Sequence, residues 1–246
     1  MGKWYLHGFY AKSSAIRHYL PPTAIFQEKT LNKFMREYKA VYIKPDREHK
    51  GKGIVKAWQT RSGYTFVVLR GKAVKAGSLP TLYSKIKRTS LPQRYIIQKA
   101  IPLARVRDRP FDVRVMMMRN LQNQWEFFGL YAKVAGPQSI VTNISSSRGY
   151  VTTFEAAMKH SLGYSKASAE RVKRQLVRLS HQICRHAGKI KYYQKIGIDY
   201  AIDNRGRVWV IEVNFTYPGF QGFARLPDKT AYRRIKRMND ILSRKR

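Results

Sequence analysis

The stretch Ile196–Gly219, IGIDYAIDNRGRVWVIEVNFTYPG, decides the fold. Its two short apolar runs are separated by Asp203-Asn204-Arg205-Gly206, a sequence rich in turn-forming residues. Apolar runs on either side of such a turn predict an antiparallel β-hairpin. A two-residue turn at the centre of the hairpin would pair Asp199 on the first strand with Val210 on the second.

Acidic and amide side chains gather on one face of this predicted hairpin. Side chains alternate with a period of two along a strand, so Asp199 shares a face with Glu212 and Asn214. Asp199 lies on the diagonal from Glu212, with roughly 7–8 Å between backbone positions. Buried carboxylates this close need a cation, and an all-oxygen set suits Mg²⁺ rather than zinc. The alternative is a surface hairpin with scattered acids, which the apolar flanks and the scarcity of acids in the chain disfavour.

The composition indicates a folded and very basic protein. The chain has 246 residues, with 49 Lys plus Arg against 14 Asp plus Glu, and a formal net charge of +35. Such a charge favours a polyanionic partner, and we expect non-specific polyanion contact. Because 43% of the residues are hydrophobic and 13% are aromatic, the composition favours a folded protein over a basic disordered tail. The single cysteine, Cys184, cannot form an internal disulfide, which suits a reducing cytosol.

The sequence carries no recognisable export or membrane signal. The first twenty residues are broken by Lys, His and Arg and hold no apolar core of signal-peptide length. No apolar run approaches the roughly 20 residues of a membrane-spanning helix. We therefore expect a cytoplasmic protein with no membrane insertion.

The first half of the chain predicts a helix followed by a strand that ends at a lysine. Apolar residues between Leu31 and Tyr38 follow helical spacing, and Lys33 lies one step from that stripe. The strand Ala40–Pro45 carries Lys44 near its end. The loop at 46–53 contains two glycines, which let backbone amides approach an anion closely, although a plain hairpin turn is an equal alternative.

Further strands and helices complete the predicted α+β architecture. Strands are expected at 64–69, 94–101, 111–119 and 124–134. The clearest helix is 165–187, and a last basic helix is expected at 231–242.

The order of these elements resembles the ATP-grasp superfamily. The resemblance rests on the helix with Lys33, the runs VYIKP, YIIQKAI and FDVRV, and the hairpin IGIDYAID…VWVIEVN. Its most specific part is the spacing of Asp199 thirteen residues before Glu212, with Asn214 two further on. The run GLYAKVAGPQSIVTNISSSRGY is similar to the YheC/YheD family of spore-coat-associated ATP-grasp proteins. The resemblance covers about residue 20 to the C-terminus.

The resemblance implies an ATP-grasp fold, in which nucleotide lies between two α+β lobes that are each built on an antiparallel sheet. We expect a basic N-terminal segment at 1–22 and an ATP-grasp domain at 23–246, with lobe 1 at about 23–100 and lobe 2 at about 101–246. We expect no counterpart of the N-terminal domain that precedes this module in many such enzymes. The spore-coat relatives add spore association to the expected location.

The same resemblance implies roles for individual residues. The ATP phosphates would be contacted by two lysines and covered by a glycine loop: Lys33, Lys44, Gly51 and Gly53. The adenine would lie against a hinge segment and the ribose near an aspartate: Gln98, Lys99, Ile101 and Asp112. Catalytic groups would face the phosphates and the reaction centre: Arg114, Lys133 and Asn143. One or two Mg²⁺ (or Mn²⁺) ions would be held by the hairpin: Asp199, Glu212 and Asn214.

Two functions follow, and a third is disfavoured. The first is an ATP- and Mg²⁺-dependent carboxylate–amine ligase that acts through an acyl phosphate on unidentified carboxylate and amine substrates. The alternative is a non-catalytic basic protein on an ATP-grasp scaffold, associated with the spore or binding nucleic acid or another polyanion. Motifs for RNA- or DNA-binding modules are missing from the sequence, which disfavours a dedicated nucleic-acid module. A protein kinase is a poor option, because VYIK resembles the kinase lysine strand but no HRD or DFG follows.

Overall fold

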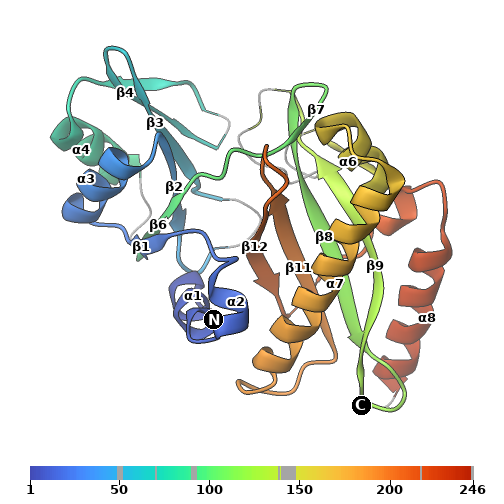
Figure 1. Ribbon diagram of the computed structural model, residues 1–246. Coiled ribbons are helices and arrows are strands. Elements are labelled where there is room, and N and C mark those ends of the chain that lie inside the picture. The colour runs from blue at the N-terminus through green and yellow to red at the C-terminus, as the bar shows by residue number, and fades with distance from the viewer. Residues whose placement is uncertain are drawn as a thin grey trace.

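A computed structural model of the chain describes residues 1–48, 52–69, 71–89, 93–137, 139, 148–216 and 218–244. The protein has two antiparallel sheets and flanking helices, so the predicted α+β class with two lobes is confirmed (Figure 1). The helices within the described residues are α1 (Lys3–Ala11), α2 (Ser14–Arg17), α3 (Glu28–Glu37), α4 (Leu79–Thr89), α6 (Phe154–Leu162), α7 (Lys166–Ala187), η1 (Phe223–Arg225) and α8 (Thr230–Arg244). None of them is both long enough and apolar enough to cross a membrane.

Lobe 1, our name for residues 23–99, contains a sheet in the order β1-β6-β2-β3-β4-β5. Its strands are β1 (Thr23–Ile25), β2 (Ala40–Pro45), β3 (Val55–Thr60), β4 (Gly63–Val68), β5 (Val74–Ala76) and β6 (Tyr95–Lys99). Helices α3 and α4 cover one face, where Val41 and Ile43 of β2 are fully buried. Because neighbours on a strand point to opposite faces, Lys44 lies on the other face, which is turned toward the rest of the protein.

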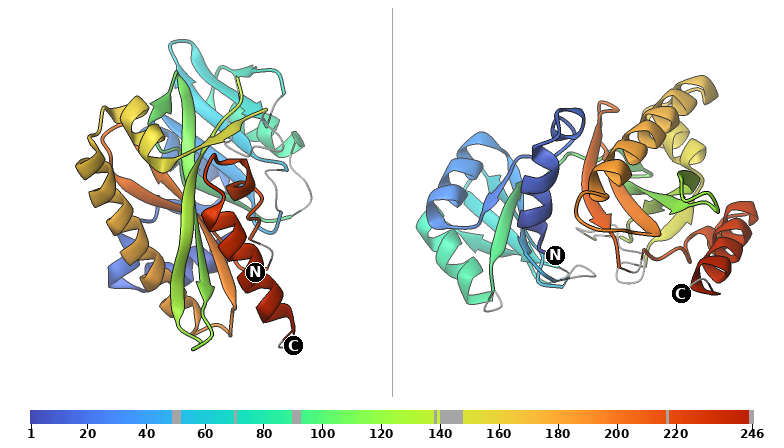
Figure 2. Two further views of the ribbon diagram at one scale, coloured as in Figure 1. Left: turned by 90° about the vertical axis from the view of Figure 1, so that its right-hand side faces the viewer. Right: turned by 90° about the horizontal axis from the view of Figure 1, so that it is seen from below.

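Lobe 2, our name for residues 101–244, contains a sheet in the order β10-β9-β8-β11-β12, and the short β7 pairs with β8. Its strands are β7 (Arg105–Val106), β8 (Arg109–Arg119), β9 (Trp125–Val134), β10 (Tyr150–Thr152), β11 (Lys195–Ile202) and β12 (Val208–Asn214). Helices α6 and α7 pack on one face and form the main core, while η1 and α8 pack on the other (Figure 2). Ser165 caps α7 by accepting from the Ser168 N–H at 3.2 Å.

The N-terminal residues are helical and belong to the core of lobe 2. Tyr10 and Ile16, from α1 and α2, are buried in the same cluster as α7. The ring of Phe9 lies 4.4 Å from that of His186 on α7, centroid to centroid. Figure 1 shows α1 and α2 beside the lower end of α7, close to both lobes. From the sequence we expected only a basic segment at residues 1–22, and its charge gave no indication that these residues pack against lobe 2.

The hairpin forms as predicted, but its register differs from the expectation. Asp199 pairs with Glu212 rather than with Val210, and Tyr200 pairs with Val210. The turn holds three residues rather than two, because the Asp203 N–H donates to the Arg207 carbonyl oxygen at 3.0 Å and Gly206 adopts a φ of 80°. A bulge between Asp199 and Tyr200 keeps Asp199 on the same face of the hairpin as Glu212 and Asn214, as predicted. Asp199 is therefore directly opposite Glu212, not on the diagonal.

Asp203 holds the turn of this hairpin, and its removal should destabilise the protein. Its Oδ1 accepts from the N–H groups of Arg205 and Arg207, each at 2.9 Å, and its Oδ2 accepts from Trp209 Nε1 at 3.0 Å. We expect Asp203→Ala to lower the free energy of unfolding by about 3 kcal/mol, because one buried and two partly buried donors lose their shared acceptor. Urea unfolding measures this. Asn204→Ala, at an exposed position of the same turn, should change it by less than about 0.5 kcal/mol. Equal losses in both variants would contradict the assignment.

Candidate functional site

A buried ion network centred on Asp199 joins four strands of lobe 2. Arg114 donates through Nε to Asp199 Oδ1 at 2.7 Å and through Nη2 to Oδ2 at 2.8 Å, a bidentate pair. Lys133 Nζ donates to Asp199 Oδ1 at 2.8 Å and lies 3.0 Å from Asp112 Oδ1. Asn214 Nδ2 donates to Asp199 Oδ2 at 3.1 Å. Five residues expected at the site thus come together.

Strand pairing is what brings these side chains together. Asp199 on β11 is directly opposite Arg114 on β8, and Asp112 on β8 is directly opposite Lys133 on β9. Asp112 and Arg114 are two residues apart, so they share a face of the sheet. Asp199 on β11 lies on this face too. Its neighbour Tyr200 points to the α7 side, where its hydroxyl lies 2.8 Å from that of Ser180, so Asp199 must point to the opposite side.

Charges within the network hold one another in their ionised forms. Burial by itself would raise the pKa of Asp199, but Arg114 and Lys133 outweigh it and hold that pKa well below its usual range. Burial by itself would lower the pKa of Lys133, but Asp112 and Asp199 outweigh it and raise that pKa above the ordinary value for lysine. Both groups therefore remain charged near neutral pH.

Lys44 lies in lobe 1, in contact with a neutral partner rather than an acid. Its Nζ donates to Gln98 Oε1 at 2.7 Å, and Gln98 Nε2 donates to Thr23 Oγ1 at 3.0 Å. Burial lowers the pKa of Lys44 to about 8, although the charge of Glu212 raises it and that of Lys3 lowers it further. The effect of Glu212 on the pKa of Lys44 indicates that this lobe 2 carboxylate lies within electrostatic range of Lys44.

The expected hinge residues lie where the two lobes meet. The ammonium of Lys99 lies over the rings of Tyr38, at 5.1 Å, and Trp209, at 5.7 Å from the ring centroids. Ile101 is buried in a small apolar cluster with Ala201 and Trp209. Lys99 and Ile101 therefore connect β6 to the outer end of the hairpin.

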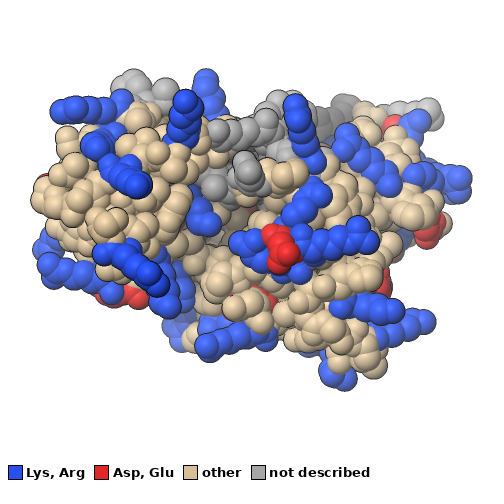
Figure 3. All heavy atoms as spheres, turned by 90° about the horizontal axis from the view of Figure 1, so that it is seen from above, with Lys and Arg blue, Asp and Glu red and all other residues tan. Residues whose placement is uncertain are grey.

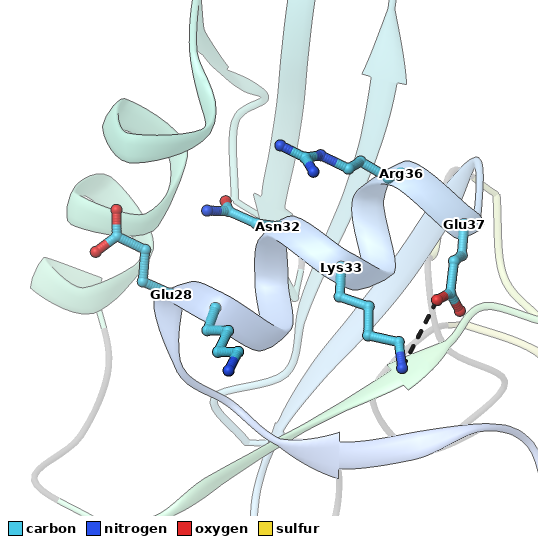
Figure 4. Close-up of a pocket in the computed structure, with 6 residues that line it drawn as sticks. Glu28, Asn32, Lys33, Arg36 and Glu37 are labelled. Carbon is cyan, nitrogen blue, oxygen red and sulfur yellow. Dashed lines mark ion pairs between the residues drawn. The ribbon is translucent and has the colours of Figure 1, made fainter.

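Lys33 is not brought together with these residues. It lies on α3, which covers the opposite face of the lobe 1 sheet from Lys44, and its side chain is 66% exposed. Figure 4 shows it in a shallow pocket of mixed charge on α3, with its ammonium 3.8 Å from the Glu37 carboxylate. Its contact with ATP phosphates stays a prediction, to which the described structure lends no support.

Three further residues were expected at the site: Gly51, Gly53 and Asn143. Gly53 has a left-handed φ of 71° and lies just before β3. Gly51 and Asn143 lie outside the described residues. Their expected roles stay predictions.

The chain matches the profile of a protein family described as YheC/D like ATP-grasp over residues 1–239. It belongs to this family. It is 24% identical over 217 residues to the endospore coat-associated protein YheD of Bacillus subtilis (strain 168), covering 86% of this chain and 47% of YheD. It is 20% identical over 235 residues to the endospore coat-associated protein YheC of the same strain, covering 91% of this chain and 61% of YheC. The chain thus spans less than two thirds of the length of these relatives.

Solved ATP-grasp structures share the fold at low sequence identity. The C-terminal domain of K. lactis Pby1, an ATP-grasp enzyme that interacts with the mRNA decapping enzyme Dcp2, superposes with a TM-score of 0.57 at 14% identity, covering 98% of this chain and 71% of that domain. The ATP-grasp ligase PsnB, complexed with a variant precursor, Mg and ADP, gives 0.54 at 11% identity and coverages of 97% and 57%. The ADP complex of the N5-carboxyaminoimidazole ribonucleotide synthetase purK gives 0.52 at 10% identity and coverages of 90% and 45%. Such likeness shows the ATP-grasp fold alone.

The hairpin of this ATP-grasp chain offers oxygen ligands that suit Mg²⁺ in kind. Glu212 has no hydrogen-bonding partner for its carboxylate among the described residues, and Asn214 uses its amide nitrogen on Asp199. Both oxygens of Asp199 accept from Arg114, with Lys133 and Asn214 as additional donors. Across the described part of the chain, three His, Cys, Asp or Glu side chains nowhere converge as a metal cluster. Glu212 and Asn214 therefore fit a shared site that phosphate oxygens would complete, and Asp199 as a ligand stays a prediction.

Sequence reasoning missed one charged group near this ATP-grasp site. Lys3, at the start of α1, experiences the field of Glu212 and in turn acts on Lys44. It is far from both in the sequence, and no motif surrounds it. Only the packing of α1 between the lobes reveals its position.

ATP affinity should depend on the protonation of Lys44. Because the pKa of this lysine is lowered to about 8, it loses its positive charge as the pH rises above 8, whereas the ATP phosphates stay ionised. We expect ATP binding, measured by calorimetry at constant ionic strength, to weaken by up to about tenfold per pH unit above 8. Lys44→Met should bind weakly at all pH values and show a smaller dependence on pH. A flat profile for the unaltered protein between pH 7 and 9.5 would contradict the prediction.

Proposed function

We propose that this protein is an ATP- and Mg²⁺-binding ligase that joins a carboxylate to an amine through an acyl phosphate. The observation that carries the proposal is the buried Asp112–Arg114–Lys133–Asp199–Asn214 network with Glu212 beside it and Lys44 across from it. Such a set combines fixed cations for phosphate with carboxylates for a metal ion. The ATP-grasp fold supports the proposal, because solved proteins that share it were seen with ADP (purK) and with Mg and ADP (PsnB).

The chemistry needs charge stabilisation rather than a nucleophilic side chain. In the first step, a carboxylate oxygen of the substrate bonds to the terminal phosphorus of ATP, and ADP leaves. In the second step, the amine nitrogen bonds to the acyl carbon, inorganic phosphate leaves, and the nitrogen loses a proton. Negative charge is spread over the phosphoryl group in the first transition state, so nearby fixed cations lower the barrier.

The roles of the residues follow from their charges and partners. Lys44 would bind phosphate as a point charge, because its partner Gln98 leaves its positive charge unneutralised. Arg114 and Lys133 are the proposed catalytic cations, together with Asn143, which is outside the described residues. Glu212 and Asn214, with Asp199, would hold Mg²⁺, and the ion would supply positive charge that offsets the charge of the phosphates. Gln98, Lys99 and Ile101 would flank the base, and Asp112 the ribose.

A screen for ADP release tests ligase turnover. Purified protein is incubated with Mg-ATP and a panel of amino acids, peptides and poly-acids, and ADP is measured by a coupled assay. Hydroxylamine added in place of the amine should trap an acyl phosphate as a hydroxamate. ADP release that requires a particular carboxylate, with hydroxamate formation, is the expected result. ATP binding without ADP release across the panel would favour the non-catalytic alternative.

Glu212 should contribute to nucleotide binding only when Mg²⁺ is present. We expect Glu212→Gln to lower the ATP-dependent rise in melting temperature by at least half in Mg²⁺, because one metal ligand loses its charge. In EDTA the same variant should bind ATP no more weakly than the unaltered protein, since a carboxylate that repels phosphate has been removed. Glu28→Gln, on the exposed start of α3, is the matched control and should change neither value. A full Mg-ATP shift in Glu212→Gln would refute the metal role.

A specific observation also favours polyanion binding as a second function. Arg171, Arg174, Arg178 and Arg185 are exposed along α7, a helix of 22 residues, at spacings that place them in one stripe. The ion pairs that α7 makes within the described residues involve Lys173 instead. Figure 3 shows Lys and Arg side chains spread over one face of both lobes, with few Asp or Glu among them. The exposed arginines of α7 could therefore bind the phosphate backbone of a nucleic acid without sequence preference.

The salt dependence of nucleic-acid binding tests this second function. Each neutralised phosphate on a DNA duplex contributes about −0.9 to the slope of log K against log salt concentration. We expect unrelated duplexes to bind with one common steep slope, and Arg174→Gln/Arg178→Gln/Arg185→Gln to reduce it by about 3. Filter binding across a salt series measures both. Tight, salt-resistant binding to one sequence, or an unchanged slope in the triple variant, would contradict this prediction.

A further inference from the structure

Helix α1 is fixed to lobe 1 immediately after the strand that carries Lys44. The N–H of Lys3 donates to the Asp46 carbonyl oxygen at 2.9 Å, and the N–H of Trp4 donates to Asp46 Oδ1 at 2.8 Å. Asp46 is only 6% exposed, and a carboxylate is favoured at the positive end of a helix. The first turn of α1 is therefore fixed two residues beyond Lys44.

Gly2 makes this close approach possible. A Cβ atom at position 2 would lie 2.5 Å from Asp46 Oδ2 and 2.7 Å from Oδ1, closer than real Cβ atoms come to any neighbour. The Asp46 side chain cannot move away without giving up its hydrogen bond to the Trp4 N–H. A side chain larger than that of glycine at this position would therefore push α1 away from Asp46.

The other end of the same segment is fixed to lobe 2. His186 Nε2 on α7 lies 3.1 Å from the Phe9 carbonyl oxygen, and the Val210 N–H on β12 donates to the Tyr19 carbonyl oxygen at 2.8 Å. Residues 1–20, which we call the N-terminal strap, therefore contact both lobes. Its first turn is bonded to lobe 1, and its later residues are bonded to lobe 2.

The side chain of Lys3 extends from the strap toward the candidate nucleotide site. Its Nζ donates to the carbonyl oxygen of Glu48, in the segment that follows Lys44. Burial lowers the pKa of Lys3, while Glu212, Asp46 and Glu48 raise it through their charges. Because Glu212 acts on both Lys3 and Lys44, the two ammonium groups share the surroundings of one hairpin carboxylate.

We propose that Lys3, presented by the N-terminal strap, forms with Lys44 a two-cation site for the terminal phosphates of a nucleoside triphosphate. The proposal rests on the proposed function for the identity of the anion. Neither ammonium group is neutralised by a salt bridge among the described residues, and Lys3 donates only to a carbonyl oxygen there. An anion that contacts both groups removes their mutual repulsion, so the pair is better satisfied when phosphate is bound.

Adenine nucleotides of different phosphate number test which part of the ligand Lys3 faces. We expect Lys3→Met to weaken ATP binding by about tenfold, the typical contribution of one charged hydrogen bond, and ADP binding by less. AMP binding should stay within about twofold, because AMP lacks the terminal phosphates. Calorimetry with the full chain in Mg²⁺ measures all three. An equal loss for ATP, ADP and AMP, or tighter ATP binding, would overturn the proposal.

Two matched variants separate this role from general effects of charge and folding. Lys12→Met removes an exposed lysine that follows the same helix and should leave ATP binding unchanged. Lys3→Arg keeps the positive charge and should bind ATP within about threefold of the unaltered protein. Failure of Lys3→Arg to restore binding in a protein of normal melting temperature would contradict the phosphate contact.

A third variant moves Lys3 without removing it. Gly2→Ala should displace the first turn of α1 from Asp46 and weaken ATP binding in the same direction as Lys3→Met. The double variant Gly2→Ala/Lys3→Met should then bind about as weakly as Lys3→Met alone. Additive losses would show that the strap acts on ATP by a route other than Lys3 and would overturn the assignment.

Inorganic tripolyphosphate distinguishes failure of this proposal from failure of the proposed function. If the protein binds tripolyphosphate but no adenine nucleotide, and Lys3→Met weakens that binding while Lys12→Met does not, the proposed function fails and the two-cation site stands. If ATP and tripolyphosphate bind Lys3→Met as tightly as the unaltered protein, the two-cation site fails and the proposed function stands. Absence of tripolyphosphate binding by the unaltered protein would overturn the site itself.

Discussion

The carboxylate of Asp199, held between the guanidinium of Arg114 and the ammonium of Lys133, is the interaction on which the rest of the structure depends. The three groups come from β11, β8 and β9, and Asn214 adds β12, so the contact exists only when four strands pair in one register. Removing one member of a buried ion pair leaves an unmatched charge and costs about 3–5 kcal/mol. The sheet of lobe 2 and its site are therefore formed together, and a slip of one residue in any of these strands would lose both.

Cations at the candidate site are paired with carboxylates in lobe 2 but not in lobe 1, and this difference decides which lobe attracts an anion. In lobe 2, the cations Arg114 and Lys133 are matched by Asp112 and Asp199, so the network has little net charge to offer. In lobe 1, the Lys44 ammonium donates to the neutral amide of Gln98, and no salt bridge neutralises it among the residues that the structure describes. Positive charge without an acidic hydrogen-bonding partner thus lies on the lobe 1 side, while lobe 2 supplies metal ligands and the fixed cations that we propose for catalysis. A nucleotide that contacts both sides would draw the lobes together through its phosphates.

The acidic hairpin could be predicted because alternation along a strand is a local property, and Asp199, Glu212 and Asn214 do share a face. Its register could not, because the bulge beside Asp199 and the three-residue turn closed by Gly206 depend on backbone geometry that short sequence patterns do not specify. Resemblance to the family placed Arg114 and Lys133 near the site, where strand pairing joins them to Asp199. Sequence patterns placed two other parts of the chain less well. Lys33 resembled a family position on a helix, yet it lies on the outer face of lobe 1. Residues 1–20 matched no motif, yet they contact both lobes.

Strand alternation also separates the matched, buried charges from the exposed basic surface. On β11, Tyr200 points toward α7 and bonds Ser180, whereas Asp199 points to the opposite face and bonds Arg114. The arginine stripe of α7 is therefore on one side of the sheet and the candidate nucleotide site on the other. Exposed charges are screened within about 8–10 Å at physiological salt, whereas buried pairs are screened much less. Salt can thus release a polyanion from α7 while the ion network around Asp199 stays intact, so a charge of +35 and a specific nucleotide site are compatible in one chain.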